Sequence, residues 1–172
     1  MASLMESLMD ILDKENSEYQ ELLGLSLQKT PIIISGNLEA LQKITDEEQN
    51  VINRIAHLEQ LRQENIKDIA NVINRDVNTL KLKDLIQMLE SRPAERNKLA
   101  DIYDRLSDTM KRMVRVNEQN RELIQNALEM VEFDMNLIQS LRKAPETANY
   151  NKGAYSAGST VGRTAGRFDA RQ

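Results

Sequence analysis

Residues 93–143 read PAERNKLADIYDRLSDTMKRMVRVNEQNRELIQNALEMVEFDMNLIQSLRK, and they decide the fold. Apolar side chains recur along this stretch in alternating steps of four and three residues from Leu99 to Leu141, the spacing of a coiled-coil seam. Pro93 suits the first position of a helix, and Pro145 prevents the helix from continuing. The pattern therefore predicts one continuous helix, on the order of 75 Å long, that packs its seam against shorter helices.

Two asparagines, Asn117 and Asn120, interrupt the predicted seam. A buried Asn at a seam position costs stability but fixes the register of the packed helices. The same pair could instead contact a bound ligand, and the sequence leaves both interpretations open. The full predicted seam is Leu99, Tyr103, Leu106, Met110, Met113, Asn117, Asn120, Ile124, Ala127, Val131, Asp134, Ile138 and Leu141.

Around and beyond Asn120 the apolar surface of this helix becomes wider than one helix–helix contact uses. The apolar residues on its flanks are Val116, Leu123, Leu128, Met130, Phe133, Met135 and Leu137. Two partner helices of about 43 Å cannot cover both flanks along the whole helix, so part of this surface is expected to bind another molecule. Methionines here would tolerate several partner shapes, although Met is also an ordinary core filler. Alternatively, the first helix and a second copy of the chain bury this face.

The N-terminal third predicts a second amphipathic helix. Apolar residues at helical spacing predict a helix over 3–29. Pro31 should kink or stop this helix near residue 30, and the isoleucines after it are expected to continue as helix until Gly36 breaks it. Residues 37–44 then predict only a short amphipathic turn or two.

Thr45 and Glu48 have the spacing of a capping box, in which each side chain bonds the other residue's backbone amide. This motif predicts that another long helix starts at Thr45 and runs to about Asn74. The connector over 75–92 is predicted to contain one short helix around Leu82–Leu89.

Together these patterns predict an all-α fold, an antiparallel bundle of three long coiled-coil-like helices with short connector helices. The bundle domain is expected to cover residues 1–143. Residues 144–172 hold four of the six Gly and show no apolar period, which predicts a flexible, disordered Gly/Ser-rich tail.

The composition limits the classes of partner and compartment. The net charge of the whole chain is −4, which argues against nucleic acid as the main partner. No segment is long and apolar enough to insert stably in a membrane, and the N-terminus does not resemble a signal peptide. These features favour a cytoplasmic protein.

Motifs that carry chemistry are missing from the sequence. The chain has no Cys and a single His, His57, whose position on a helix favours a solvated or packed side chain over a catalytic one. No phosphate-binding loop or metal-binding motif occurs. We therefore expect no enzyme activity, no cofactor and no metal site.

Three stretches resemble the FlgN family of flagellar type III export chaperones. The first is ISGNLEALQKITDEEQNVINRI (34–55), and the second is the asparagine pair within VNEQNRELIQNALEMVEFDMNLI (116–138). The third is YNKGAY (150–155), a Tyr- and Gly-containing segment after the long helix. The residues that match the family's C-terminal pattern are Asn117, Asn120, Leu123, Ile124, Leu128, Val131 and Ile138.

The resemblance implies a cytoplasmic chaperone that binds the C-terminal segments of hook–filament junction proteins. Such proteins prevent premature assembly of these clients and escort them to the export apparatus through its ATPase-associated components. Because amphipathic client segments suit the wide apolar face, Met130, Met135 and Leu137 join the matching residues as expected client-binding residues. A structural coiled-coil protein that homodimerises through the same face is the alternative, and an amphipathic membrane-surface protein is a third.

Overall fold

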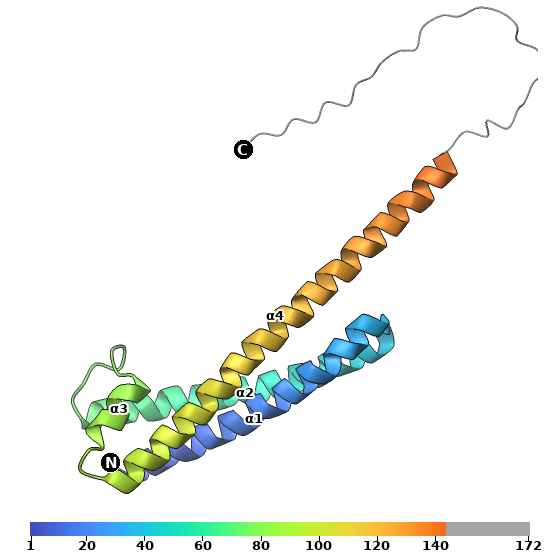
Figure 1. Ribbon diagram of the computed structural model, residues 1–172. Coiled ribbons are helices and arrows are strands. Elements are labelled where there is room, and N and C mark those ends of the chain that lie inside the picture. The colour runs from blue at the N-terminus through green and yellow to red at the C-terminus, as the bar shows by residue number, and fades with distance from the viewer. Residues whose placement is uncertain (144–172) are drawn as a thin grey trace, which may run out of the picture. The chain divides into compact units, whose positions relative to one another are not determined.

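The computed structural model describes residues 1–143, which contain four α-helices and no strand (Figure 1). The helices are α1 (Ala2–Ser35), α2 (Leu38–Val72), α3 (Leu82–Met88) and α4 (Pro93–Lys143). The all-α fold class is thus confirmed, and α3 and α4 lie where the sequence predicted them. The expected tail, 144–172, lies outside the described residues.

α1 passes through Pro31 without ending and stops at Gly36, as the sequence predicted for the segment after the proline. Pro31 is exposed, where water can satisfy the backbone carbonyl that proline leaves without its helical donor. Gly36 ends the helix with φ of 68°, a left-handed conformation that glycine adopts without a steric penalty.

The predicted capping box at Thr45 and Glu48 is wrong, because α2 starts seven residues earlier, at Leu38. Asn37 caps this helix, and its side chain accepts a hydrogen bond from the amide of Ala40 at 3.0 Å. Thr45 instead donates to the carbonyl of Leu41 at 2.8 Å, one turn earlier in the same helix. An Asn directly after a left-handed Gly already supplies the cap, so the turn and the start of α2 coincide.

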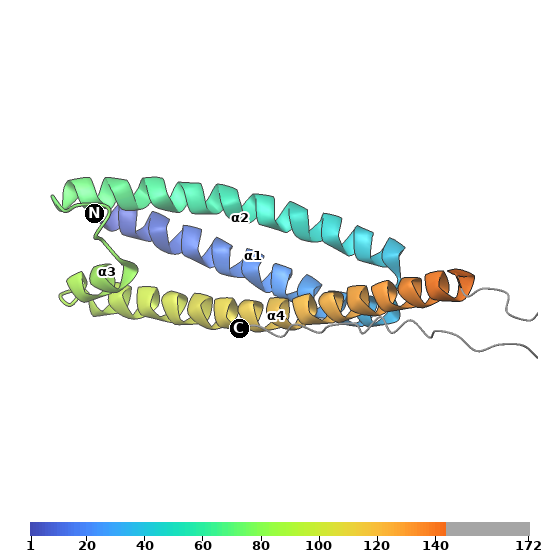
Figure 2. The ribbon, with the colours of Figure 1, turned by 90° about the horizontal axis from the view of Figure 1, so that it is seen from above.

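Two apolar clusters hold the helices together. The larger one joins the start of α1, the end of α2, α3 and the start of α4, and includes the fully buried Leu8, Ile69 and Leu99. The smaller one is formed by Leu22, Leu23, Val51, Ile55 and Met113. Figures 1 and 2 show α1 and α2 side by side as a hairpin.

The ion pairs and hydrogen bonds give the helix directions. Along α1, the partners in α2 run backwards from Arg62 to Glu48, so α1 and α2 are antiparallel. The partners of α1 in α4 instead run forwards, from Arg105 to Asn120, so α1 and α4 point the same way.

The buried edge of α4 differs in part from the predicted seam. Leu99, Met113 and Asn120 are buried as expected, but Ile102 and Thr109 are buried where Tyr103 and Met110 were predicted. Ile102 packs in the larger apolar cluster, whereas Thr109 is buried because its hydroxyl donates at 3.0 Å to Oδ1 of Asn16 in α1. The prediction chose apolar residues for the seam and missed this hydrogen-bonded layer.

Candidate functional site

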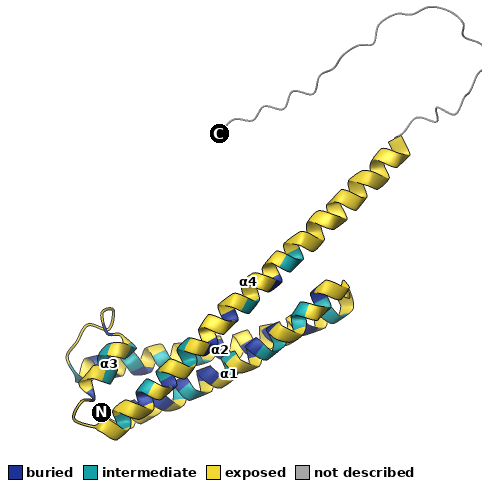
Figure 3. Cartoon of the chain, in the orientation of Figure 1, coloured by how far each residue is buried: buried dark blue, intermediate teal, exposed yellow. Residues whose placement is uncertain are grey.

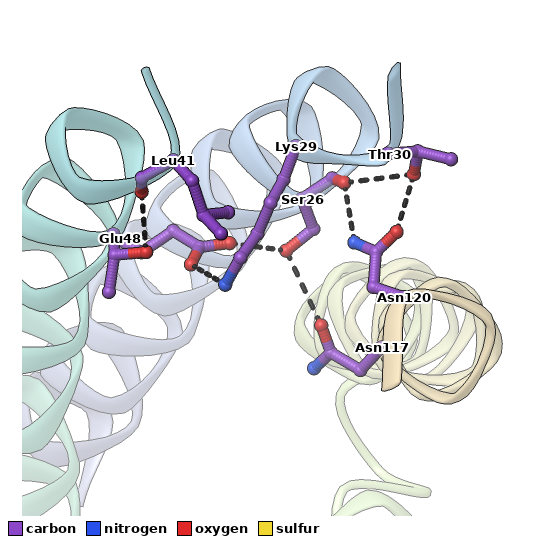
Figure 4. A network of polar contacts seen from close by, with 8 residues as sticks. Ser26, Lys29, Thr30, Leu41, Glu48, Asn117 and Asn120 are labelled. Carbon is purple, nitrogen blue, oxygen red and sulfur yellow. Dashed lines mark hydrogen bonds and ion pairs between the residues drawn. The ribbon is translucent and has the colours of Figure 1, made fainter. Parts of the chain in front are cut away.

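A polar network joins α1, α2 and α4 just before the wide apolar face begins (Figure 4). Ser26 donates to Oε1 of Glu48 at 3.0 Å, and Nζ of Lys29 lies 2.7 Å from Oε2 of the same carboxylate. Nδ2 of Asn120 donates to the backbone carbonyl of Ser26 at 2.8 Å, and Thr30 donates to Oδ1 of Asn120 at 2.6 Å. Each buried polar group of this network has a hydrogen-bonding or ion-pair partner, so the network stabilises the packing of α1 against α2 and α4.

The two predicted asparagines therefore have different surroundings. Asn120 is buried, and both ends of its amide bond to α1. Asn117 is exposed, with its Oδ1 3.4 Å from the Ser26 hydroxyl. These contacts favour the register-fixing interpretation for Asn120, while Asn117 remains accessible.

A second polar layer lies between the two apolar clusters. The Glu15 carboxylate is buried and lies 2.9 Å from Nε of Arg62. Burial raises the pKa of Glu15 above its ordinary value, and the contact with Arg62 opposes that shift. Burial likewise raises the pKa of the nearby Tyr19. Polar and apolar layers thus alternate along α1.

Beyond the polar network an apolar pocket of about 310 Å³ opens between the turn joining α1 to α2 and one side of α4. Its lining residues are Ile32, Ile33, Gly36, Leu38 and Leu41 from the α1–α2 turn, which we call the corner, and Ile124, Ala127, Leu128 and Val131 from α4. Leu38 is 78% exposed. The corner was not predicted as part of the site, although the run of isoleucines over 32–34, two of which line the pocket, was the available signal.

The C-terminal part of α4 is exposed (Figure 3), and many of its exposed residues are apolar. We call this set the apolar band: Leu128, Met130, Val131, Phe133, Met135, Leu137, Ile138 and Leu141, each between 47% and 69% exposed. Of the predicted site residues, Leu123 and Ile124 are half-buried, and the rest from Leu128 onward belong to the band. From Leu128 onward the predicted wide apolar surface is therefore accessible, whereas Val116 and Leu123 are half-buried.

Residues 1–143 contain neither a candidate metal-binding group nor a candidate membrane-spanning helix. Among residues 1–143 no group of three or more His, Cys, Asp or Glu side chains could hold a metal ion. Within the same residues no helix has the length and hydropathy needed to cross a bilayer.

Comparisons with known proteins give the family. The chain is 27% identical over 134 residues to the uncharacterized protein YvyG of Bacillus subtilis strain 168, an alignment covering 77% of this chain and 76% of that protein. No solved structure matches the chain significantly. The family model described as FlgN protein matches residues 1–157. Since this match covers most of the chain and agrees with the stretches that carried the resemblance, the chain belongs to the FlgN family of flagellar export chaperones.

Proposed function

We propose that this protein is a cytoplasmic, non-enzymatic chaperone that binds the amphipathic C-terminal segments of hook–filament junction proteins. It keeps these clients from assembling prematurely and escorts them to the type III export apparatus, where it meets the ATPase-associated components. The client-binding residues we propose are Asn117, Leu123, Ile124, Leu128, Met130, Val131, Met135, Leu137 and Ile138, with Asn120 placing this surface through its bonds to α1.

The observation that carries the proposal is the apolar band. Leu128 and Met130, for example, are 64% and 68% exposed. Contiguous exposed apolar side chains of this kind usually mark an interaction site. A client helix that covers four or five of these side chains gains roughly 8–12 kcal/mol before costs. Ordering an unfolded client takes back roughly 2–5 kcal/mol. A dissociation constant of 1 μM corresponds to about 8.2 kcal/mol, so a micromolar to sub-micromolar complex requires a gain near the upper end of this range.

Two residues of the band, Leu128 and Val131, also line the pocket. A client helix that contacts these two residues can place one apolar side chain into the space beside Leu38 and Leu41. Helix-in-groove recognition of this kind uses anchors spaced three and four residues apart.

The test is calorimetric titration of the full chain with a synthetic peptide covering the C-terminal segment of a junction protein from the same genome. We expect one peptide per chain and a negative heat-capacity change. The Ile138→Ala variant should weaken binding, whereas Val114→Ala should not, because Val114 is at least as exposed on α4 as Ile138 but precedes the band.

Light scattering in the same buffer examines the alternative. A tight dimer that does not bind the peptide would assign the band to self-association and contradict the chaperone proposal.

A further inference from the structure

The charged residues of α4 between Glu122 and Leu141 all have one sign. They are Glu122, Glu129, Glu132 and Asp134, and basic residues occur only at the edges of this segment, at Arg121, Arg142 and Lys143. All four acidic residues are exposed, and none forms an ion pair with any residue from 1 to 143. Two copies of this segment laid against each other would bring like charges together, which opposes pairing. A partner with basic residues beside its apolar ridge fits the surface better than a second copy does.

One of these acidic residues, Asp134, lies within the apolar band. In the helix α4, the residues three and four positions away from Asp134 are Met130, Val131, Leu137 and Ile138, and all four are exposed. Side chains at these spacings are neighbours on a helix surface. The Asp134 carboxylate is therefore surrounded on its own helix by apolar side chains that we propose bind the client.

A partner that covers these side chains removes water from the carboxylate. A carboxylate loses much free energy on desolvation unless a cation and hydrogen-bond donors replace the water. Among residues 1–143 no cation lies within ion-pairing distance of Asp134, so a partner that covers this carboxylate would have to bring one.

We propose that Asp134 is a specificity residue that pairs with a Lys or Arg placed within the apolar ridge of the client helix. The occupant of the band is thus an amphipathic helix whose ridge is interrupted by one basic residue. Helices with an unbroken apolar ridge would leave the carboxylate desolvated and unpaired, and are rejected. This inference rests on the proposed client binding and adds the chemistry by which a client is selected.

The experiment measures affinity for the same junction-protein peptide with full-length Asp134→Asn, Asp134→Leu and Asp108→Asn. We expect Asp134→Asn to lower the affinity roughly tenfold, because a cation then stays covered without its partner charge. Asp134→Leu should weaken binding at least as much. Asp108→Asn should leave it within about twofold, since Asp108 is exposed on α4, outside the band and without an ion pair in residues 1–143.

A set of peptides, each with one Lys or Arg changed to Gln, completes a double-mutant cycle. One of these peptide changes should weaken binding to the wild-type chain but have little effect on binding to Asp134→Asn. The basic residue changed in that peptide is the one that pairs with Asp134. Higher salt should reduce the difference in peptide affinity between the wild-type chain and Asp134→Asn, because salt screens the charge pair.

Three outcomes would overturn the inference while leaving client binding intact. Unchanged or tighter binding by Asp134→Leu would mean that the acid merely interrupts the apolar surface. Equal effects of every peptide change on wild type and variant would mean that no cation pairs with Asp134. Tighter peptide binding after Arg163, Arg167 and Arg171 are all changed to Gln would make the basic C-terminal segment of this chain the occupant. If the wild-type chain does not bind the peptide at all, the proposed function itself fails and this inference fails with it.

Discussion

Replacing Asn120 with Ala separates its two possible roles, fixing the register of α1 against α4 or touching a client. The substitution removes the hydrogen bond from Nδ2 to the Ser26 carbonyl, 2.8 Å, and the one from Thr30 to Oδ1, 2.6 Å. Each bond contributes about 0.5–1.5 kcal/mol to the stability of the fold. Thr30 keeps a weaker alternative acceptor, the Ser26 carbonyl at 3.3 Å. We therefore expect the free energy of unfolding to fall by about 2 kcal/mol, which lowers Tm by roughly 5 °C in a chain of this size.

The assay is thermal and urea unfolding followed by circular dichroism, with peptide titration at a temperature where the variant remains folded. Asn126→Ala is the control, because Asn126 is exposed on the same helix and makes no side-chain hydrogen bond within the described residues. Its unfolding free energy should change by less than about 0.5 kcal/mol. A variant Asn120→Ala that keeps wild-type stability but no longer binds the peptide would show that Asn120 contacts the client directly and does not fix the register.

Three further changes test other parts of the account. Burial raises the pKa of Glu15 above its ordinary value of 4.5, so the fold loses stability as this carboxyl group becomes charged with rising pH. The urea midpoint of Glu15→Gln should therefore increase relative to that of the wild-type chain between pH 4 and pH 7. A difference between the two midpoints that does not change with pH would show that burial does not control this pKa. Gly36→Ala should lower the unfolding free energy by about 1 kcal/mol, because the φ of Gly36 is 68°. Gly24→Ala, inside α1, should raise the unfolding free energy by about 0.5–1 kcal/mol. Equal effects of the two substitutions in thermal unfolding would contradict a left-handed cap at Gly36. Leu8→Ala should lower the unfolding free energy by about 2–5 kcal/mol, because Leu8 is fully buried. Leu141→Ala should change it little in the same measurement, because Leu141 is 69% exposed. A large loss of stability in Leu141→Ala would show that the band is buried in a core.

The helical fold was predictable because its signals are local. Pro93 and the regular apolar spacing after it give the bounds of α4, and Gly36 marks the end of α1. The start of α2 was missed because Thr45 and Glu48 have the spacing of a cap but lie inside a helix. A spacing of this kind does not reveal that Asn37, directly after the turn, already caps the helix.

The polar layers were harder to predict than the apolar face. The apolar band could be predicted from one helix alone, because the sequence of α4 has more apolar residues than its partner helices can cover. Exposed side chains such as Leu128 and Met135 can be identified in this way without knowing any tertiary contact. The burial of Thr109 depends on Asn16, ninety-three residues earlier, and the corner joins the pocket only once α1 and α4 are in place. Contacts between distant residues of this kind leave no periodic signal in one sequence.

The most direct test of the central claim is titration of the purified full chain with a junction-protein C-terminal peptide, with the mass of the chain measured in the same buffer. We expect one peptide per chain, a dissociation constant in the micromolar to sub-micromolar range and a negative heat-capacity change. A tight dimer that gives no heat with the peptide would contradict the proposed chaperone function.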